Sequence, residues 1–407
     1  MKRILILLAM VPVVCGTAAV AAAATTSEAI DRTTGETGAQ SHYIRGAYQM
    51  GTVLATNDFV EGKNARGEAI DRYHLARLEF GWQTSGDKDW HHLYNFPSWG
   101  VGLSAGDYFH DEELGRPTSL YGFFDWPVKR WGRRVLNVEL GFGLTDNWVG
   151  FDEVTNPYNV AIGAGRSVYI DIGANVELPL ARRWWLQLGF TGTHYSNGGS
   201  QQPNWGINQL GALAYVKHDL QPRVLPAVRR ELAPLVAHWE TAVTFAGGVR
   251  NLALDYRDNT DVPEEIRHYL QKNYPVFNAM LTLTRRFSHM SAWDAGLDLS
   301  YDGSLADLER VDAFENGRQP ESIAFFEHLG VGVFGGYEHV VHDTRLILQL
   351  GYTAVRRSVP GQLPRLYQRL GLKHHVWTDA FFGLNVRFND FSRANNLEFN
   401  IGYRFGT

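Results

Sequence analysis

The stretch from Thr193 to Asn208, THYSNGGSQQPNWGIN, holds the residue types of a hydrolytic site. His194 and Ser196 are two positions apart, and side chains two apart on a β-strand lie on the same face. A serine hydroxyl attacks a carbonyl once a neighbouring base removes its proton, and histidine is the base that proteins use most often. The same residues also suit a polar turn that ends a strand. The character of the surrounding chain therefore distinguishes an active site from a turn.

Donors for an oxyanion follow directly in the sequence. The backbone N–H groups of Gly198 and Gly199 and the side-chain amide of Asn204 could hydrogen-bond the negative oxygen that forms when an ester is attacked. One such donor contributes ~3 kcal/mol of transition-state stabilisation in other hydrolases. A serine–histidine mechanism requires no cofactor or metal ion, and we expect none.

Composition limits the class of protein. The 407 residues carry a net charge of −5, and no basic excess indicates nucleic acid as a partner. Residues 1–24 have the features of a secretory signal peptide, in which Lys2 and Arg3 precede an apolar core and an Ala-x-Ala cleavage sequence. The only cysteine, Cys15, lies in this leader, so the mature chain forms no disulfide. No later apolar run approaches the ~20 residues of a membrane helix, and a membrane span therefore requires strands.

Alternating apolar and polar residues recur from residue 42 to the C-terminus. The pattern is cleanest over 136–144, 168–178 and 397–405. A period of two gives each strand one apolar and one polar face. A soluble sandwich and a transmembrane barrel share this pattern. Segments of ~10–12 residues, with acids such as Asp171 and Glu177 inside them, favour a membrane barrel with a polar lumen. Tryptophans near the segment ends resemble the aromatic girdles of such barrels: Trp131, Trp148, Trp184 and Trp185.

The connections alternate between short and long, as periplasmic turns and external loops do in outer-membrane barrels. They predict an all-β, antiparallel transmembrane barrel of about 16 strands (roughly 12 to 16, because boundaries are the weakest assignments). We expect eight strands in 42–220, with 237–407 completing the same barrel, and two smaller barrels as the less favoured alternative. Residues 221–236 do not alternate and are expected to form a periplasmic connector with a short helix. Residues 25–41 are expected to be a disordered N-terminal segment.

Strand parity places the stretch on the outside of the barrel. The strand that leads into it has Leu186, Leu188 and Phe190 at even positions, so its even face is the lipid face. His194 and Ser196 continue that face. Asn208 shares a face with the apolar residues of the next strand and therefore also points outward. Polar groups that face lipid are costly and tend to be functional.

The two halves of the stretch, HYSNGG and QPNWGIN, resemble the motif of the outer-membrane lipid A 3-O-deacylases of the PagL type and the related acyloxyacyl hydrolase-like barrels. The resemblance extends weakly over the first eight expected strands and faintly over the C-terminal strands. It implies that Ser196 attacks an ester of lipid A, that His194 is its base, and that Asn204 binds the oxyanion. Small members of the family have eight strands, so residues 237–407 would be additional.

The chain departs from this motif at one position. The family's acid, which orients the histidine, falls on Asn208. An asparagine carbonyl can orient an imidazole, as in Cys-His-Asn sites, but it carries no charge. The departure therefore predicts a catalytic group of Ser196, His194 and Asn208 that is slower than the family's, or inactive.

These observations predict an outer-membrane serine esterase of a Gram-negative bacterium that removes an acyl chain from lipid A, with lipopolysaccharide as its substrate. A non-catalytic porin or lipid-binding transporter is the main alternative. An outer-membrane phospholipase with the same site is the second. The sequence leaves the oligomeric state open.

Overall fold

The computed structural model describes most of the chain. The predicted signal peptide and nearly all of the expected disordered segment lie outside the described residues, while Ser41 already belongs to the first strand. The described residues are 40–223, 225, 229–252, 263–270, 272–391 and 393–405.

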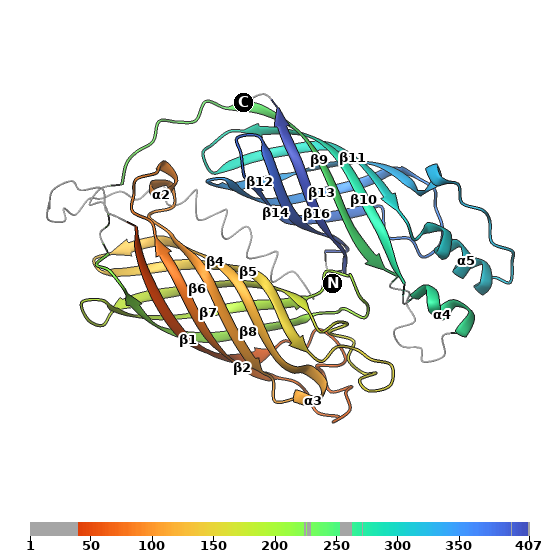
Figure 1. Ribbon diagram of the computed structural model, residues 1–407, viewed down its shortest axis with the longest axis horizontal. Helices are drawn as coiled ribbons and strands as arrows, with labels where there is room; N and C mark the ends of the chain where they lie inside the picture. Colours follow the sequence, from red (N-terminus) through yellow and green to blue (C-terminus); the bar gives the residue numbers. More distant parts are fainter. Residues whose placement is uncertain are drawn as a thin grey trace. The chain divides into compact units, whose positions relative to one another are not determined.

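The strands form two closed antiparallel barrels of eight strands each (Figure 1). The total of sixteen agrees with the predicted number. The expectation of one large barrel is wrong, because β8 pairs with β1 and β16 pairs with β9. Each closure leaves no free strand edge, so the backbone groups of every strand are paired within its own barrel.

The first barrel contains two short helices in its connections. Its elements are β1 Ser41–Val53, β2 Arg72–Gln83, α2 Asp89–Leu93, β3 Ser98–Asp107, α3 Asp111–Leu114, β4 Gly115–Trp131, β5 Arg134–Trp148, β6 Ser167–Pro179, β7 Trp184–Ser196 and β8 Ile207–Asp219.

The second barrel carries its helices in the connections after β9 and β11. Its elements are β9 His238–Asn251, α4 Glu264–Leu270, β10 Asn273–Arg286, β11 Ser291–Asp302, α5 Leu305–Glu315, the 3₁₀ helix η3 Phe325–His328, β12 Leu329–Val341, β13 Thr344–Arg356, β14 Leu366–His375, β15 Ala380–Asn389 and β16 Arg393–Phe405.

Burial alternates along the strands in the way that a membrane barrel requires. Large apolar side chains point outward and remain exposed, for example Leu120 at 62% and Phe190 at 74%. Their strand neighbours Tyr121 and Thr191 are buried inside. An outward apolar belt and an inward polar lining match a lipid-facing wall.

Ion pairs and tyrosines fill the lumen of the first barrel. The Arg45 guanidinium donates hydrogen bonds to Glu79 and Glu139, each over 2.5 Å, and to Asp125 over 3.1 Å. All four side chains are almost completely inaccessible to solvent. Buried charges require partners, and this cluster supplies them from four strands. The inward direction predicted for the acids Asp171 and Glu177 is confirmed by their burial, and Glu139 is buried in the same way.

The lumen of the second barrel is built in the same way. The Arg369 guanidinium donates to Glu398 over 2.7 Å and to Asp298 over 2.9 Å. Arg345 pairs with Glu240 and Glu338, both at 2.8 Å. Both lumens are therefore packed with paired side chains over their described residues.

Two sequence expectations about local structure are wrong. Trp131 and Trp184 are exposed as expected of a girdle, but Trp148 and Trp185 turn inward, where the Trp185 indole N–H donates to Asp219 over 2.7 Å. In the connector 221–236, the described residues are not helical. Among the described residues, no helix has the length and apolar character needed to cross a bilayer.

Candidate functional site

The site residues lie at the end of β7 and the start of β8. These strands are antiparallel neighbours, and His194 is directly opposite Asn208. Thr193, Tyr195 and Gln209 are each about 1% exposed and face the lumen. His194 and Asn208 alternate with them and therefore lie on the outer wall, as parity predicted.

His194 and Asn208 are joined by a hydrogen bond. The distance from Nδ1 of His194 to Oδ1 of Asn208 is 2.8 Å. A carbonyl oxygen only accepts, so the imidazole carries its proton on Nδ1 in this arrangement. The lone pair is then on Nε2, which is the tautomer that a general base requires.

Thr56 orients the Asn208 amide from the other side. The Nδ2 group of Asn208 donates to Oγ1 of Thr56 over 3.0 Å, which turns Oδ1 toward His194. The backbone carbonyl of Asn208 accepts from Leu54 N–H over 2.8 Å. The connection after β1 is thereby fixed to the start of β8, and Thr56 is held beside the site.

Asn204 lies against the hydroxyl of Ser196. Its Nδ2 group donates to Ser196 Oγ over 2.9 Å, and its Oδ1 accepts from the backbone N–H of Asn197 over 2.9 Å. Ser196 is 8% exposed. The amide of Asn204 is thus oriented at both ends, with an N–H directed at the atom that would attack an ester.

Gly206 packs against the His194 ring. A Cβ at this position would lie 2.9 Å from Cε1 of His194 and 2.7 Å from the carbonyl oxygen of Tyr195. The φ of Gly206 is +73°, a conformation that other residues adopt at a cost. Its carbonyl accepts from Asn57 Nδ2 over 3.0 Å, and its N–H donates to Ala161 over 2.9 Å. These contacts hold the glycine backbone against one edge of the imidazole.

Gly198 and Gly199 form the turn after β7. Both have positive φ, +66° and +83°, which explains why glycines occupy these positions. Their role as oxyanion donors stays a prediction.

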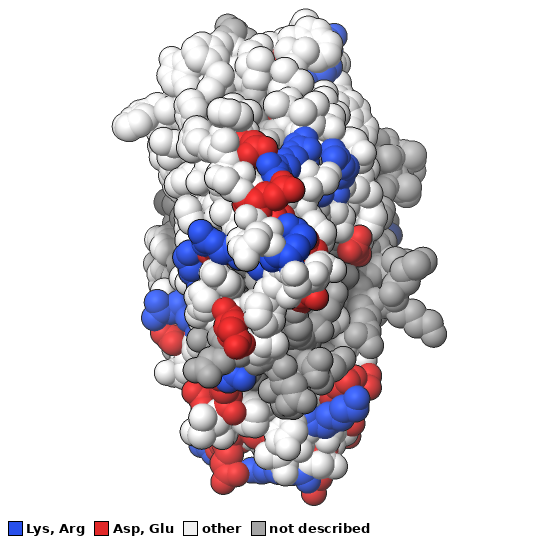
Figure 2. Space-filling view, turned by 90° about the vertical axis from the view of Figure 1, so that its right-hand side faces the viewer, with Lys and Arg blue, Asp and Glu red and all other residues white. Residues whose placement is uncertain are grey.

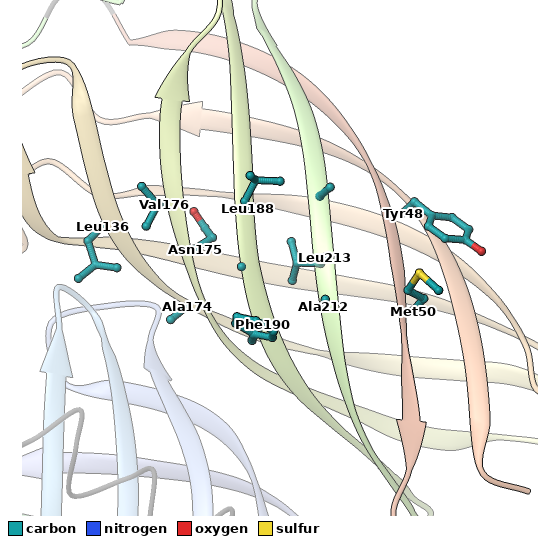
Figure 3. Close-up of a pocket in the computed structure, with 12 residues that line it drawn as sticks. Tyr48, Met50, Leu136, Ala174, Asn175, Val176, Leu188, Phe190, Ala212 and Leu213 are labelled. Carbon is teal, nitrogen blue, oxygen red and sulfur yellow. The ribbon is translucent and has the colours of Figure 1, made fainter.

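An apolar groove crosses the outer wall of the first barrel over β5, β6, β7, β8 and β1 (Figure 3). Its volume is about 590 Å³. Phe190 of β7 stands among small residues of the neighbouring strands, and this contrast in size forms the groove. The outward-facing residues that line it include Tyr48, Met50, Ala174, Leu188, Ala212 and Ala214.

The groove and the site lie on the same face of β7. Phe190 and His194 both project outward, and Gly192 is the outward position between them. Gly192 adds no side chain of its own between the groove and the imidazole, but Cδ2 of Leu210, its partner on β8, lies 3.2 Å from the place of a Cβ at position 192. The wall between the groove and His194 is therefore lined by Leu210.

Sequence reasoning missed Thr56, Gly192 and Gly206 as members of the site. Thr56 is 152 residues from Asn208, and no local pattern connects them. The only available signal for Gly206 was its place in the sequence PNWG, where a glycine after polar turn residues suggests a required positive φ. For Gly192, parity alone would have put it on the outer face between Phe190 and His194.

Comparison with known families agrees with this architecture. Residues 74–216 match the family model "Lipid A 3-O-deacylase (PagL)", and residues 239–407 match "Acyloxyacyl hydrolase, C-terminal domain". The fold and these matches define an outer-membrane β-barrel protein. Within that class, the chain belongs to the PagL-type lipid A deacylase and acyloxyacyl hydrolase-like family, which confirms the resemblance seen in the sequence.

Solved structures include several similar barrels. The crystal structure of the outer membrane enzyme PagL is 18% identical and covers 42% of this chain and 97% of its own, with a TM-score of 0.28. A mutant of the Rh. blastica porin is 10% identical and covers 90% of this chain and 99% of its own, with a TM-score of 0.17. CdiB from Acinetobacter baumannii is 11% identical and covers 90% and 60%, with a TM-score of 0.18. A comparison with curated proteins finds no match.

Proposed function

We propose that the chain is a serine esterase that removes an ester-linked acyl chain from lipid A at the outer wall of its first barrel. The observation that carries the proposal is the 2.8 Å hydrogen bond from His194 Nδ1 to Asn208 Oδ1 on the lipid-facing side. Polar side chains that face lipid are energetically costly, and those that occur there tend to have a function. The bond also leaves Nε2 as the basic nitrogen.

The groove gives the acyl chain a place beside these residues. Lipid tails are as apolar as the groove, so transfer between them provides little hydrophobic driving force. The groove instead selects an acyl chain through shape and packing. The path of the chain toward His194 runs over Gly192 and beside the Leu210 side chain. The substrate thus stays in the outer leaflet while its ester reaches the serine.

The acylation step uses the serine, the histidine and Asn204. His194 Nε2 takes the proton of Ser196 Oγ as the oxygen attacks the ester carbonyl carbon. The Nδ2 group of Asn204, already 2.9 Å from Oγ, donates to the oxyanion that forms. The tetrahedral intermediate then collapses, and the C–O bond to the lipid A sugar breaks. The proton on Nε2 passes to the sugar oxygen, which leaves as a hydroxyl.

Hydrolysis of the acyl-serine repeats the sequence with water. Nε2 takes a proton from the water as it attacks the acyl carbon. The second intermediate breaks its bond to Oγ, and the proton returns to Ser196. The products are a fatty acid and lipid A lacking one acyl chain.

Asn208 sets the rate of this mechanism. Its carbonyl fixes the tautomer and the ring orientation of His194 but does not stabilise the imidazolium by charge. The enzyme should therefore turn over more slowly than one with a carboxylate at this position.

The filled lumens of the two barrels argue against the alternative that the chain is a porin. Arg45 and its carboxylate partners occupy the interior of the first barrel, and Arg369 with Glu398 and Asp298 occupies the second. Water-filled channels require a wider barrel than eight strands provide.

Mass spectrometry of lipid A from a Gram-negative host that expresses the chain tests the proposal. Wild type should produce lipid A that lacks the mass of one acyl chain, and Ser196→Ala should restore the host's spectrum. Identical spectra from wild type and Ser196→Ala would contradict the proposal. Release of fatty acid from glycerophospholipid micelles by wild type, without any change in lipid A, would assign the same site to a phospholipase.

A further inference from the structure

The second barrel has a polar pocket at the mouth where β9, β11, β13 and β15 end. We call it the arginine pocket, because Arg250, Arg356 and Arg387 line it from three different strands. Its volume is about 70 Å³, the space of roughly two water molecules. Basic and acidic side chains lie intermixed on the face drawn in Figure 2.

The carboxylates of the arginine pocket are already engaged. Asp302 accepts from Arg250 over 2.6 Å and from the Ser304 N–H over 2.9 Å. Glu327 is paired with Arg357 and also accepts from Ala324 N–H over 2.7 Å. Neither acid is left to neutralise the other two arginines of the pocket.

Arg356 has a donor without a partner. Its Nη2 group donates to the carbonyl of Leu363 over 2.7 Å, whereas its buried Nε has no hydrogen-bond partner in the described part of the chain. Asn396 lines the same pocket and is 3% exposed. Its Nδ2 likewise has no partner among the described residues. Buried donors without acceptors are costly, so these two groups indicate a missing acceptor.

Arg387 adds a second guanidinium, whose carboxylate partner is more distant. Its guanidinium lies 3.8 Å from the centre of the Tyr367 ring and donates to Asn278 Oδ1 over 3.1 Å. The carboxylate oxygen of Asp298 is 3.9 Å away and already accepts from Arg369 over 2.9 Å. Arg369 pairs with both Asp298 and Glu398, so these two carboxylates balance Arg369 and Arg387 together. Arg356 is then the guanidinium of the pocket without a carboxylate partner among the described residues.

We propose that the arginine pocket binds a phosphate group. A phosphate monoester carries close to two negative charges at neutral pH and three or more acceptor oxygens. These match the charge of Arg356, the neighbouring Arg387, and the buried donors of Arg356 and Asn396. Water would satisfy the donors but not the charge. The site belongs to the second barrel and does not depend on hydrolysis at Ser196.

Calorimetric titration of the full chain with inorganic phosphate tests this site. The protein is held in neutral detergent micelles at low ionic strength, with chloride as the reference anion. Wild type should bind phosphate. Arg356→Gln removes a charged donor, and Asn396→Asp places a negative charge in the pocket without changing its shape, so each should weaken binding by at least about tenfold.

Arg318→Gln is the matched control. Arg318 lies on the same barrel but is paired with Glu309 and Asp312, so the substitution removes the same charge outside the pocket. It should leave phosphate affinity within about twofold. Absence of phosphate binding by folded wild type, or equal affinities for wild type, Arg356→Gln and Asn396→Asp, would overturn the proposal. Asn396→Ala provides a second small variant that keeps the test decisive if a charged substitution prevents folding.

A competition arm distinguishes the source of the phosphate. Phosphate titration is repeated in the presence of bisphosphorylated lipid A or its dephosphorylated form, with Ser196→Ala protein so that no ester is cut. Competition by the phosphorylated lipid alone assigns the pocket to a lipid headgroup. Competition by neither lipid assigns it to free phosphate. Equal competition by both would show that the pocket does not recognise phosphate.

Discussion

His194 and Asn208 form a cross-strand pair on the lipid-facing wall of the first barrel, and Nδ1 of the histidine donates to Oδ1 of the asparagine over 2.8 Å. The pair has the geometry of a base and its orienting group, but it lacks the negative charge of a carboxylate. This difference makes the contribution of charge measurable in a site whose shape stays constant.

Asn208→Asp should increase the rate of lipid A deacylation. Aspartate has the length of asparagine, so a carboxylate oxygen can occupy the Oδ1 position and stabilise the imidazolium. We expect kcat to rise by at least about tenfold, below the ~10⁴-fold that separates Asp from Asn in serine proteases. The acid limb of the pH–rate profile should move to higher pH, because the carboxylate holds a proton on the histidine more strongly and the base must be neutral to act.

Asn208→Ala is the control for this prediction, since it removes the acceptor and should lower kcat below wild type. A loss of activity in Asn208→Asp, with the barrel folded, would mean that the site is built around the amide.

Thr56→Val should lower kcat by about tenfold. The variant removes the acceptor of Asn208 Nδ2, and a buried donor without a partner costs ~1–3 kcal/mol, which releases the amide from its fixed orientation. In the Asn208→Asp background the two carboxylate oxygens are equivalent, so loss of Thr56 should matter less. A double-mutant cycle on kcat measures this difference. Equal effects of Thr56→Val in both backgrounds would argue against an orienting role.

Gly206→Ala should reduce kcat by about a hundredfold while the barrel folds. The new Cβ would lie 2.9 Å from Cε1 of His194, and displacement of a catalytic group by about 1 Å has effects of this size. Gly67→Ala is the matched control, because Gly67 has a φ of +67° and no atom within 4 Å of an added Cβ. If both alanine variants lose activity equally, backbone strain and not the imidazole contact is responsible.

Gly192→Phe should block the passage of the acyl chain toward His194. The outward-facing ring would stand between Phe190 and the imidazole and would displace Leu210, whose Cδ2 lies 3.2 Å from an added Cβ. We expect KM to rise and kcat/KM to fall by about tenfold or more, with the larger loss for long acyl chains, because binding of the chain positions the ester. Gly122→Phe places the same ring on the outer face of β4, and its kinetics should equal those of wild type. Unchanged kinetics in Gly192→Phe would show that the acyl chain does not reach His194 from the groove.

The sequence was sufficient for those features that depend on local alternation. The period of two located the strands and placed His194, Ser196 and Asn208 on the outer face, because parity follows from backbone geometry alone. The same reasoning placed Asp171 and Glu177 in the lumen. Parity also places Trp185 in the lumen, because Trp185 and Gln187 are both odd-numbered residues of β7 and share its inward face.

Features that depend on pairing between distant segments could not be predicted from the sequence. Alternation within β8 does not specify whether its next neighbour is β1 or β9, so one barrel and two barrels give the same pattern. Thr56 reaches Asn208 only because the first barrel closes and the connection after β1 packs on β8. The contact of Gly206 with His194 likewise depends on the path of the connection between β7 and β8.

The most direct test of the central claim is covalent labelling of the serine by an alkyl p-nitrophenyl phosphonate. Attack of Ser196 Oγ on phosphorus expels p-nitrophenolate and leaves a stable adduct, which peptide mass spectrometry locates. We expect an adduct on Ser196 in wild type, none in Ser196→Ala, and strongly slowed labelling in His194→Ala. An adduct at another residue, or equal labelling rates in wild type and His194→Ala, would contradict a serine nucleophile activated by His194.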